Sequence, residues 1–404
     1  MIMLMLRTFL HHKAIVVLVV LQVAISYAVT TNSIYLMQGH WIRSHLTTGL
    51  DDGSLVIAQV TGVDGSDMSD AEALEDMATI RAVNGVDAVS EVNMMPASKN
   101  AFTISLYATP KDSDPVLRRV PMYLGKDHYI EALGIRLIQG RSFVDTEYVK
   151  YDPFRSGPYP FVAVITSALA TKIWPGVDAL GKTLYVGQKK FPVRVVGLAG
   201  HLMSSDFSRS SDSDITILMP TSTLSGGVYV AHVSKPSVGA LSDSIRDALY
   251  KADPNRMVQF SRPYSTIVEQ FFQHDRFVVY MLLAVVLVLV VLATAGVAAL
   301  SMLWIRQRTR SIGIRRALGA TAGDIVQYFL VENVIVVFTG LVLGVGLSIA
   351  LNDFLISHFE VQRLPLVNYA FSSMLFLAMG QLAALYPVVT GSKMPPAMAM
   401  RRHV

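Results

Sequence analysis

Long apolar runs alternate along the chain with segments of mixed composition. A helix that crosses a bilayer needs about 20 predominantly apolar residues. Four runs come close to or exceed that length, at residues 14–37, 277–305, 334–351 and 370–390. They predict four transmembrane helices. The mixed segment 38–274 that separates the first two runs is long enough for one or two ordinary domains.

The mixed segment shows two sets of strands and helices around an insertion. Strand-like alternation over 54–60 and 86–92 encloses a helical pattern over 70–83, which predicts a β-α-β unit. A second set follows near the end of the segment, as a strand, a helix, a strand and a helix leading toward the membrane, at 228–233, 238–250, 257–260 and 263–276. The stretch 101–225 has short strands and turns, so we interpret it as an inserted subdomain.

The second apolar run is longer than a bilayer requires. Its roughly 29 residues would extend about 44 Å as a helix, whereas the hydrocarbon core is about 30 Å thick. We therefore expect this helix to project outward as part of a stalk joined to the mixed segment.

The first apolar run also has features of a signal peptide. Arg7 and Lys13 precede it, and Ser26-Tyr27-Ala28 resembles a small-residue cleavage site. The run continues to Met37, beyond what a signal peptide needs, so a retained membrane anchor is the favoured interpretation.

Lysine and arginine beside the runs predict the orientation. Only 16% of the residues are charged, yet basic residues gather before the first run, between the second and third, and after the fourth. They are Arg7 and Lys13; Arg306, Arg308, Arg310, Arg315 and Arg316; and Lys393, Arg401 and Arg402. This side is predicted to be cytoplasmic, with both termini (1–13 and 391–404), and the segments 38–274 and 352–369 lie outside. Since this pattern accounts for the positive charge, nucleic acid is not an expected partner.

The segment 306–333 lies between two apolar runs and is basic and amphipathic, with five arginines and no lysine. Its apolar residues recur at helical spacing, at Ile312, Ile314, Ala317 and Leu318 and then at Ile325, Phe329 and Leu330. Gly319 and Thr321 allow a break between a short first helix and a following one. We expect the apolar side chains to dock into a cytoplasmic partner, with Arg315 and Arg316 contacting its acidic rim or lipid headgroups.

The sequence of this segment resembles that of the coupling helix of the MacB/FtsX-like ABC permeases. Ile312 to Ala320 match almost letter for letter, with Asp324 and Glu332 in register, whereas Ser311 stands where the family usually has Glu. The resemblance implies that nine residues couple the chain to an ATPase: Ile312, Gly313, Ile314, Arg315, Arg316, Ala317, Leu318, Gly319 and Ala320.

Further motifs of the same family are spaced along the chain. They are Tyr129 to Ile135 with Gly140 to Phe143, Trp174 to Gly176 with Gly181 to Thr183, Phe191 to Gly197, and Pro395 to Arg401. The resemblance thus covers the whole chain. It implies a bacterial inner-membrane protein in which four transmembrane α-helices carry a large extracytoplasmic α/β (α+β) domain, with a porter-like subdomain and a β-rich inserted subdomain.

The function that the resemblance implies is that of a permease subunit without its own ATPase. It would pair with a second copy or a sister permease, and a partner ATPase subunit would bind the ATP. Motion of the outer domain, or mechanotransmission, would then serve the efflux of drugs or peptides with a periplasmic adaptor and an outer-membrane channel. Lipoprotein handling, control of cell-wall hydrolases in division and ligand sensing are the alternatives, and no hydrolase motif is present.

Two matches imitate nucleotide-binding motifs. Gly176 to Thr183 satisfies G-x-x-x-x-G-K-[ST], and Leu224 to Gly227 resembles the start of an ABC signature. A phosphate-binding loop needs a strand before it and a helix after it. Trp174-Pro175 precedes this one and a strand-like Leu184 to Val186 follows, so we predict glycine turns and no nucleotide cofactor on this chain.

Polar and small residues inside the apolar runs predict helix contacts. Gln22, Asn32 and Gln381 should face neighbouring helices, because a polar group exposed to lipid is costly. Gly340, Gly344 and Ser348 form a small-residue stripe along the third run, which predicts a close helix approach.

Other candidate chemistry is sparse. There is no cysteine, which excludes disulfides and cysteine-bound metals. His40 and His45 are predicted to be solvated surface residues. The acids within 64–76 and 204–214 lack the spacing of a calcium loop, so they are predicted to lie in solvated loops and a helix N-terminus, with no metal site.

Overall fold

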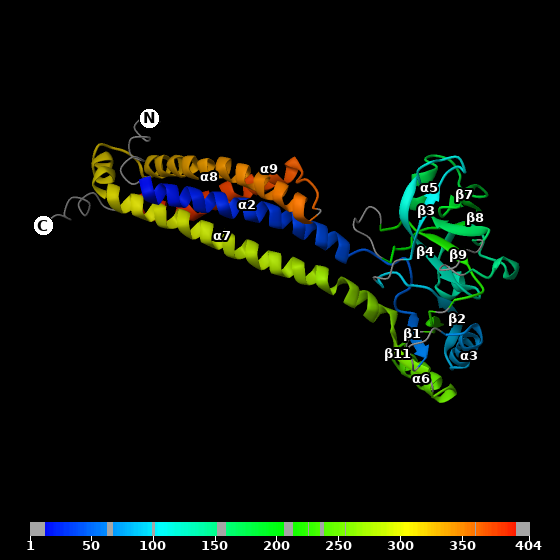
Figure 1. Ribbon diagram of the computed structural model, residues 1–404. Helices are drawn as coiled ribbons and strands as arrows, with labels where there is room; N and C mark the ends of the chain where they lie inside the picture. The colour runs from blue at the N-terminus through cyan, green and yellow to red at the C-terminus, as the bar shows by residue number, and fades with distance from the viewer. Residues whose placement is uncertain are drawn as a thin grey trace. The chain divides into compact units, whose positions relative to one another are not determined.

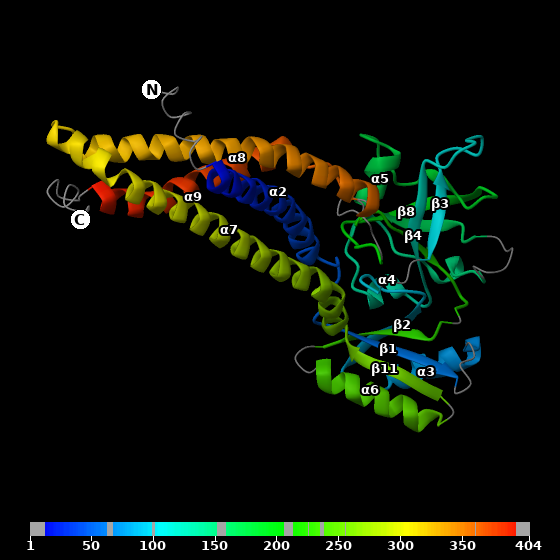
Figure 2. The ribbon, with the colours of Figure 1, turned by 60° about the vertical axis from the view of Figure 1, so that its left-hand side comes forward.

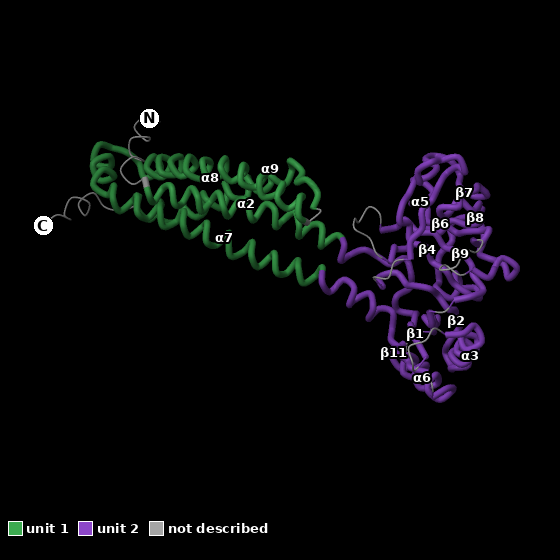
Figure 3. The backbone as a smooth tube through the Cα atoms, viewed as in Figure 1, with its two compact units in different colours: residues 1–42, 275–404 green, residues 43–274 purple. Residues whose placement is uncertain are grey.

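The computed structural model describes residues 13–62, 68–98, 102–151, 159–205, 213–224, 226–234, 238–254, 256–359 and 361–392. The chain divides into two compact units (Figure 3). Residues 1–42 and 275–404 form the helical unit, and residues 43–274 form the sheet unit. The two predicted termini, 1–13 and 391–404, lie almost entirely outside the described residues, as does the motif Pro395 to Arg401.

Four long helices make up most of the helical unit: α2 (Lys13–Ser44), α7 (Tyr264–Ala317), α8 (Ala322–Phe359) and α9 (Leu366–Ser392) (Figure 1). Each is long and apolar enough to cross a membrane. All four extend beyond the apolar runs in the sequence, because helical hydrogen bonding continues into the polar residues that flank each run. The predicted outer loop 352–369 narrows to the residues between Phe359 and Leu366.

Helix α7 is 54 residues long, about 80 Å at 1.5 Å per residue. It unites the predicted 263–276 helix, the predicted span and the first part of the basic segment. The expectation of a separate short helix after residue 306 is therefore wrong. No proline lies between residue 306 and Gly319, and a single glycine such as Gly313 is tolerated inside a helix, so α7 continues to the break at Gly319.

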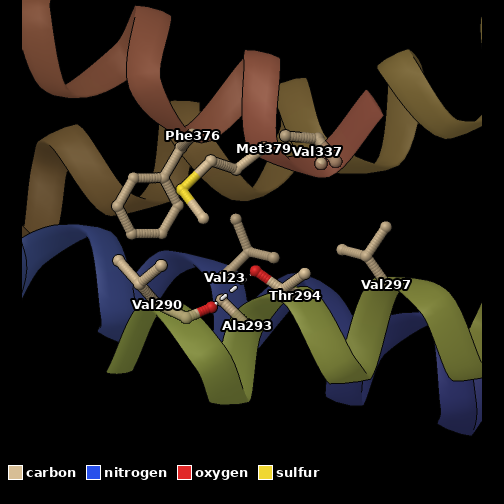
Figure 4. A pocket seen from close by; sticks show the side chains of 9 residues that line it. Val23, Val290, Ala293, Thr294, Val297, Val337, Phe376 and Met379 are labelled. Carbon is tan, nitrogen blue, oxygen red and sulfur yellow. Dashed lines mark hydrogen bonds between the residues drawn. The ribbon is translucent and has the colours of Figure 1, made fainter. Parts of the chain in front are cut away.

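The helical unit has an apolar core to which all four helices contribute. Val23 and Tyr27 of α2, Val297 of α7, Val337 of α8 and Phe376 of α9 are among its buried members. A small pocket lined by side chains of all four helices has a volume of about 10 Å³ (Figure 4). This is no more than the space that one water molecule needs. The helices are thus closely packed at this level.

The sheet unit contains two split β-α-β motifs. Their elements are β1 (Leu55–Gly62), α3 (Asp70–Arg81), β2 (Val86–Val92), β10 (Val228–Val233), α6 (Val238–Ala252) and β11 (Arg256–Pro263). The strand order is β11-β1-β10-β2, with antiparallel neighbours. The predicted β-α-β unit is therefore split, because β10 inserts between β1 and β2, which gives the ferredoxin-like arrangement.

Helices α3 and α6 cover one face of this split sheet (Figure 2). A capping box of Ser69 and Glu72 starts α3. Alternate residues of the strands face the helices, so Val56 and Ala58 are buried against Met77 and Ile245. The residues between them, such as Ile57, face the opposite side.

The insertion between β2 and β10 forms a closed ring of strands. The ring contains β3 (Thr103–Tyr107), β4 (Leu117–Gly125), β6 (Val162–Thr166), β7 (Thr183–Val186), β8 (Phe191–Ala199) and β9 (Ile217–Pro220). Pairing runs β4-β3-β7-β8-β6-β9 and returns through a parallel β9–β4 contact. Short additions are α4 (Tyr129–Ala132), β5 (Leu137–Gly140), the 3-10 turn η1 (Asp145–Glu147) and α5 (Ser167–Ile173). Closure buries one apolar cluster inside the ring, including Leu106, Met122 and Ile165.

Two buried ion pairs hold the sheet unit together, and the sequence analysis identified neither. Lys126 Nζ lies 2.8 Å from a Glu91 carboxylate oxygen and 3.1 Å from Asp70. Burial raises the pKa of the Glu91 carboxyl, although Lys126 beside it acts in the opposite direction. Asp76, predicted to be solvated, is fully buried and contacts Arg256. That prediction is wrong because local charge density does not reveal a partner 180 residues away.

Candidate functional site

The predicted break at Gly319 is a helical turn that closes α7. The Ala320 amide donates to the Arg315 carbonyl at 3.0 Å, and the Gly319 amide donates to the Arg316 carbonyl at 3.1 Å. This pair of bonds is the Schellman arrangement, which requires a left-handed residue. Gly319 supplies it with φ +98°, so a side chain at this position would be strained.

A second cap starts α8 immediately afterwards. Thr321 Oγ1 accepts from the Asp324 amide at 3.2 Å, and the Asp324 carboxylate accepts from the Thr321 amide at 2.9 Å. This is a capping box with Asp in place of Glu. With both helix ends capped, α7 and α8 form a hairpin with a defined tip, residues 314–324.

One ion pair joins the two arms of the hairpin. Arg308 of α7 donates both terminal nitrogens to Glu332 of α8, at 2.7 and 3.0 Å. Glu332 is almost fully buried, and the Arg308 guanidinium also lies over the rings of Trp304 and Phe329. A bidentate pair of this kind fixes both side chains, so the arms are held in one register. No sequence spacing rule relates Arg308 to Glu332, which is why the sequence analysis missed it.

The apolar side chains of the tip do not share one face. Ile314 is 49% exposed and Leu318 is 84% exposed, whereas Ile312 is only 6% exposed. Residues two apart on a helix point in opposite directions, while residues four apart are neighbours. Ile312 therefore packs in the core of the helical unit, and its predicted place on the docking face is wrong. Ile314 and Leu318 form the exposed apolar pair.

The remaining predicted coupling residues surround this pair. Gly313 is buried, Ala317 and Gly319 are exposed, and Ala320 is half-buried. Arg315 is exposed and lies over the Tyr328 ring, 4.9 Å from its centre. Arg316 donates to the Ser392 carbonyl at 2.8 Å. This bond holds one nitrogen of the guanidinium at the end of α9, and the contact of Arg316 with a partner or lipid stays a prediction.

Ser311, which replaces the usual Glu of the family, lies on the exposed side of α7. The helix continues through this position. No separate first turn exists there, so no side chain is needed to anchor one.

The small-residue stripe of α8 faces α2. A Cβ at Gly340 would lie 2.8 Å from Val23, and one at Gly344 would lie 2.8 Å from Tyr27. Ser348 Oγ accepts from Asn32 Nδ2 at 2.9 Å. These three positions let the two backbones approach closely.

Two other polar residues in the helices have definite partners. Gln22 Nε2 donates to the Leu292 carbonyl of α7 at 2.7 Å. His40 Nδ1 lies 2.6 Å from the carboxylate of Asp275, whose side chain is 7% exposed. The prediction that His40 is a solvated surface residue is therefore wrong, because the long α7 brings Asp275 beside α2.

The nucleotide-like motif lies between a helix and a strand. Helix α5 ends at Ile173 and β7 begins at Thr183, whereas a phosphate loop needs the reverse order. Gly176 and Gly181 have φ values of +72° and +76°, as turn glycines do. Lys182 Nζ lies over the Trp174 ring, 5.3 Å from its centre. In the second nucleotide-like match, Leu224 to Gly227, Ser225 lies outside the described residues.

Comparison with protein families matches both parts of the chain. Residues 16–251 match the MacB-like periplasmic core domain, and residues 283–396 match the FtsX-like permease C-terminal domain. Four helices are long and apolar enough to cross a membrane, and together with these two matches they indicate a multi-pass membrane permease. The chain belongs to the MacB/FtsX-like family of ABC transporter permeases.

Curated relatives include export proteins of several bacteria. The macrolide export ATP-binding/permease protein MacB of Agrobacterium fabrum is 24% identical over 342 residues, which are 80% of this chain and 49% of that protein. The probable syringafactin export ATP-binding/permease protein SyfD of Pseudomonas syringae is 29% identical over 234 residues, covering 55% of this chain and 33% of that protein. The chain thus spans half or less of the length of these relatives.

Among solved structures, the chain is similar to the periplasmic region of MacB from Actinobacillus actinomycetemcomitans. The TM-score is 0.36 with 15% sequence identity, and the match covers 56% of this chain and 94% of that one.

Proposed function

We propose that this chain is the permease subunit of an ABC transporter that works with a separate ATPase subunit. The observation that carries the proposal is the exposed pair Ile314 and Leu318 at a doubly capped hairpin tip. Apolar side chains exposed on a rigid element, beside basic residues, fit a partner with an apolar pocket and an acidic rim. Arg310 and Arg315 are the exposed basic neighbours.

The proposed mechanism is mechanotransmission through α7. The helix is continuous from Tyr264, in the sheet unit, to Ala317 at the tip. The Arg308–Glu332 pair ties the tip to α8, so a displacement of the tip moves both arms rather than bending one of them. ATP binding and hydrolysis by the partner would thus move the sheet unit, and no nucleotide need bind to this chain.

The assembly and substrates follow from the family and the charge pattern. We propose a dimer with a second copy or a sister permease, in the bacterial inner membrane, with both termini and the tip in the cytoplasm. Two relatives are named for macrolide and syringafactin export, which supports efflux of drugs, peptides or similar substrates. A periplasmic adaptor and an outer-membrane channel would complete the route.

The test is the substitution Ile314→Asp in the full complex. An aspartate pressed into an apolar pocket is costly, about 2 kcal/mol or more at a central interface position. We expect the ATPase to be lost on co-purification, with membrane insertion and protease resistance of the sheet unit unchanged. Arg315→Ala, the control, should only weaken binding, and more so at low salt. Full ATPase association and turnover in Ile314→Asp would refute the coupling role of the tip.

A further inference from the structure

The sheet unit contains a pocket on the face of the split sheet that α3 and α6 do not cover. Its volume is about 330 Å³, which is within the range of about 300–1,000 Å³ for small-molecule sites. Ile57 and Gln59 of β1, Val228 of β10 and Phe260 of β11 line its floor. The alternation of the strands directs these side chains away from the two helices.

The opposite wall comes from the first turns of α7 and from the segment after β2. Ile267 and Phe271 of α7 line the pocket with Met94 and Met95. The Tyr264 hydroxyl donates to the Pro96 carbonyl at 2.9 Å, so the methionine segment is fastened to α7. Methionine side chains adapt to irregular apolar ligands, and here two of them lie side by side in the sequence.

The charge in the pocket has a single sign. Among the described residues that line it, Arg262 is the only charged one. The Arg262 guanidinium lies 4.5 Å from the centre of the Phe260 ring, and Nη1 donates to Gln270 Oε1 at 3.2 Å. A guanidinium carries five N–H donors, so this bond leaves donors for an anion at the end of an apolar cavity.

We propose that this pocket binds a small amphiphile with one anionic group, of the class of medium-chain carboxylates. The carboxylate accepts charge-assisted hydrogen bonds from Arg262, and the alkyl body lies against Met94, Met95 and Ile267. The site is defined by the sheet unit alone, so it does not depend on the transport function proposed above.

The absence of cysteine allows a direct test. Gln59→Cys places a single thiol in the pocket of the full chain, reconstituted in phosphatidylcholine nanodiscs, and its rate of maleimide labelling is measured with hexanoate, octanoate or 1-octanol. Octanoate should slow labelling at a concentration about tenfold lower than hexanoate requires, because each buried methylene contributes about fourfold in affinity. The neutral 1-octanol should protect more weakly than octanoate.

Two controls separate this site from partition into lipid. Ser244→Cys places the thiol on the exposed face of α6 and should show no protection. Arg262→Gln, added to Gln59→Cys, should weaken octanoate protection about tenfold, whereas Arg262→Lys should retain most of it. Protease resistance reports folding, and the comparison of octanoate with 1-octanol applies even if Arg262→Gln misfolds. The proposal is overturned if octanoate fails to protect Gln59→Cys, protects Ser244→Cys equally, or protects no better than 1-octanol.

Discussion

The two ends of α7 differ in how far their apolar side chains are buried. At its start, Tyr264 and Phe272 are buried in the sheet unit, and Phe271 packs with Phe272 edge to face. At its end, Ile314 and Leu318 are exposed on a turn held by caps. One helix is therefore anchored by its own chain at one end and offers apolar surface at the other.

This difference distinguishes a structural role from a binding role. A buried aromatic contributes to folding through the apolar area it removes from water. An exposed leucine on a capped turn contributes little to folding, so its value lies in what it can bind. Substitutions at the start of α7 should unfold the sheet unit, and substitutions at the tip should affect only association.

The largest expected effect is that of Phe272→Ala. Removal of a buried aromatic costs about 3–5 kcal/mol through lost burial and the cavity left behind. Leu318→Ala, the matched change at the tip, should alter stability by less than about 0.5 kcal/mol. Urea denaturation of the full chain, followed by limited proteolysis of the sheet unit, measures both. Equal losses for the two variants would mean that the tip is part of the folding core.

A smaller effect is expected between the two ends, at the ion pair of the hairpin. Glu332→Ala leaves the Arg308 guanidinium, which is mostly buried, without its carboxylate, and should cost about 3 kcal/mol. Glu332→Gln keeps one acceptor and should cost less. The order of thermal stabilities, wild type above Gln above Ala, checks this, and coupled ATP turnover should fall in the same order. Unchanged turnover in a clearly destabilised Ala variant would show that the pair is structural only.

The smallest expected effect is a pH dependence of stability in the part of the sheet unit that packs against the start of α7. Met203 belongs to the same buried cluster as Phe272 and lies two residues after His201. The hydrogen bond that the His201 imidazole donates to the Asp214 carboxylate raises the pKa of His201. A raised pKa gives stability that is full below the unfolded value of about 6.5 and is lost as pH rises through the folded value. His201→Asn should therefore destabilise the sheet unit more at about pH 5.5 than at about pH 8.5, by less than about 1 kcal/mol because the pair is partly exposed. A larger loss at the higher pH would contradict the assignment.

The sequence predicted the elements of this fold better than their connections. Apolar length located the four membrane helices, and alternation located the strands β1, β2 and β10 within a residue or two. It did not show that β10 lies between β1 and β2, because strand order depends on packing between distant segments. Nor did it show that the inserted strands close into a ring, since closure rests on a parallel pairing between β4 and β9, which lie far apart in the sequence.

The sequence predicted where the hairpin tip lies, but not which of its side chains are exposed, and the coupling role of the tip stays a prediction. The letters Ile312 to Ala320 marked the tip correctly as the end of a helix. They could not separate Ile312 from Ile314, because that distinction depends on which face of α7 packs against the other helices. The partners of Arg316 and Arg308 lie on α9 and α8, out of reach of any local spacing rule.

Site-specific crosslinking tests the central claim most directly. Leu318 and Leu366 are each 84% exposed. Leu318 lies between α7 and α8, whereas Leu366 begins α9, after the other end of α8. The chain has no cysteine of its own. A photoreactive group attached to Leu318→Cys should crosslink to the ATPase subunit in membranes, and the same group at Leu366→Cys should not. Crosslinking from Leu366→Cys, or none from Leu318→Cys while the ATPase still co-purifies, would contradict the assignment of this tip as the coupling element.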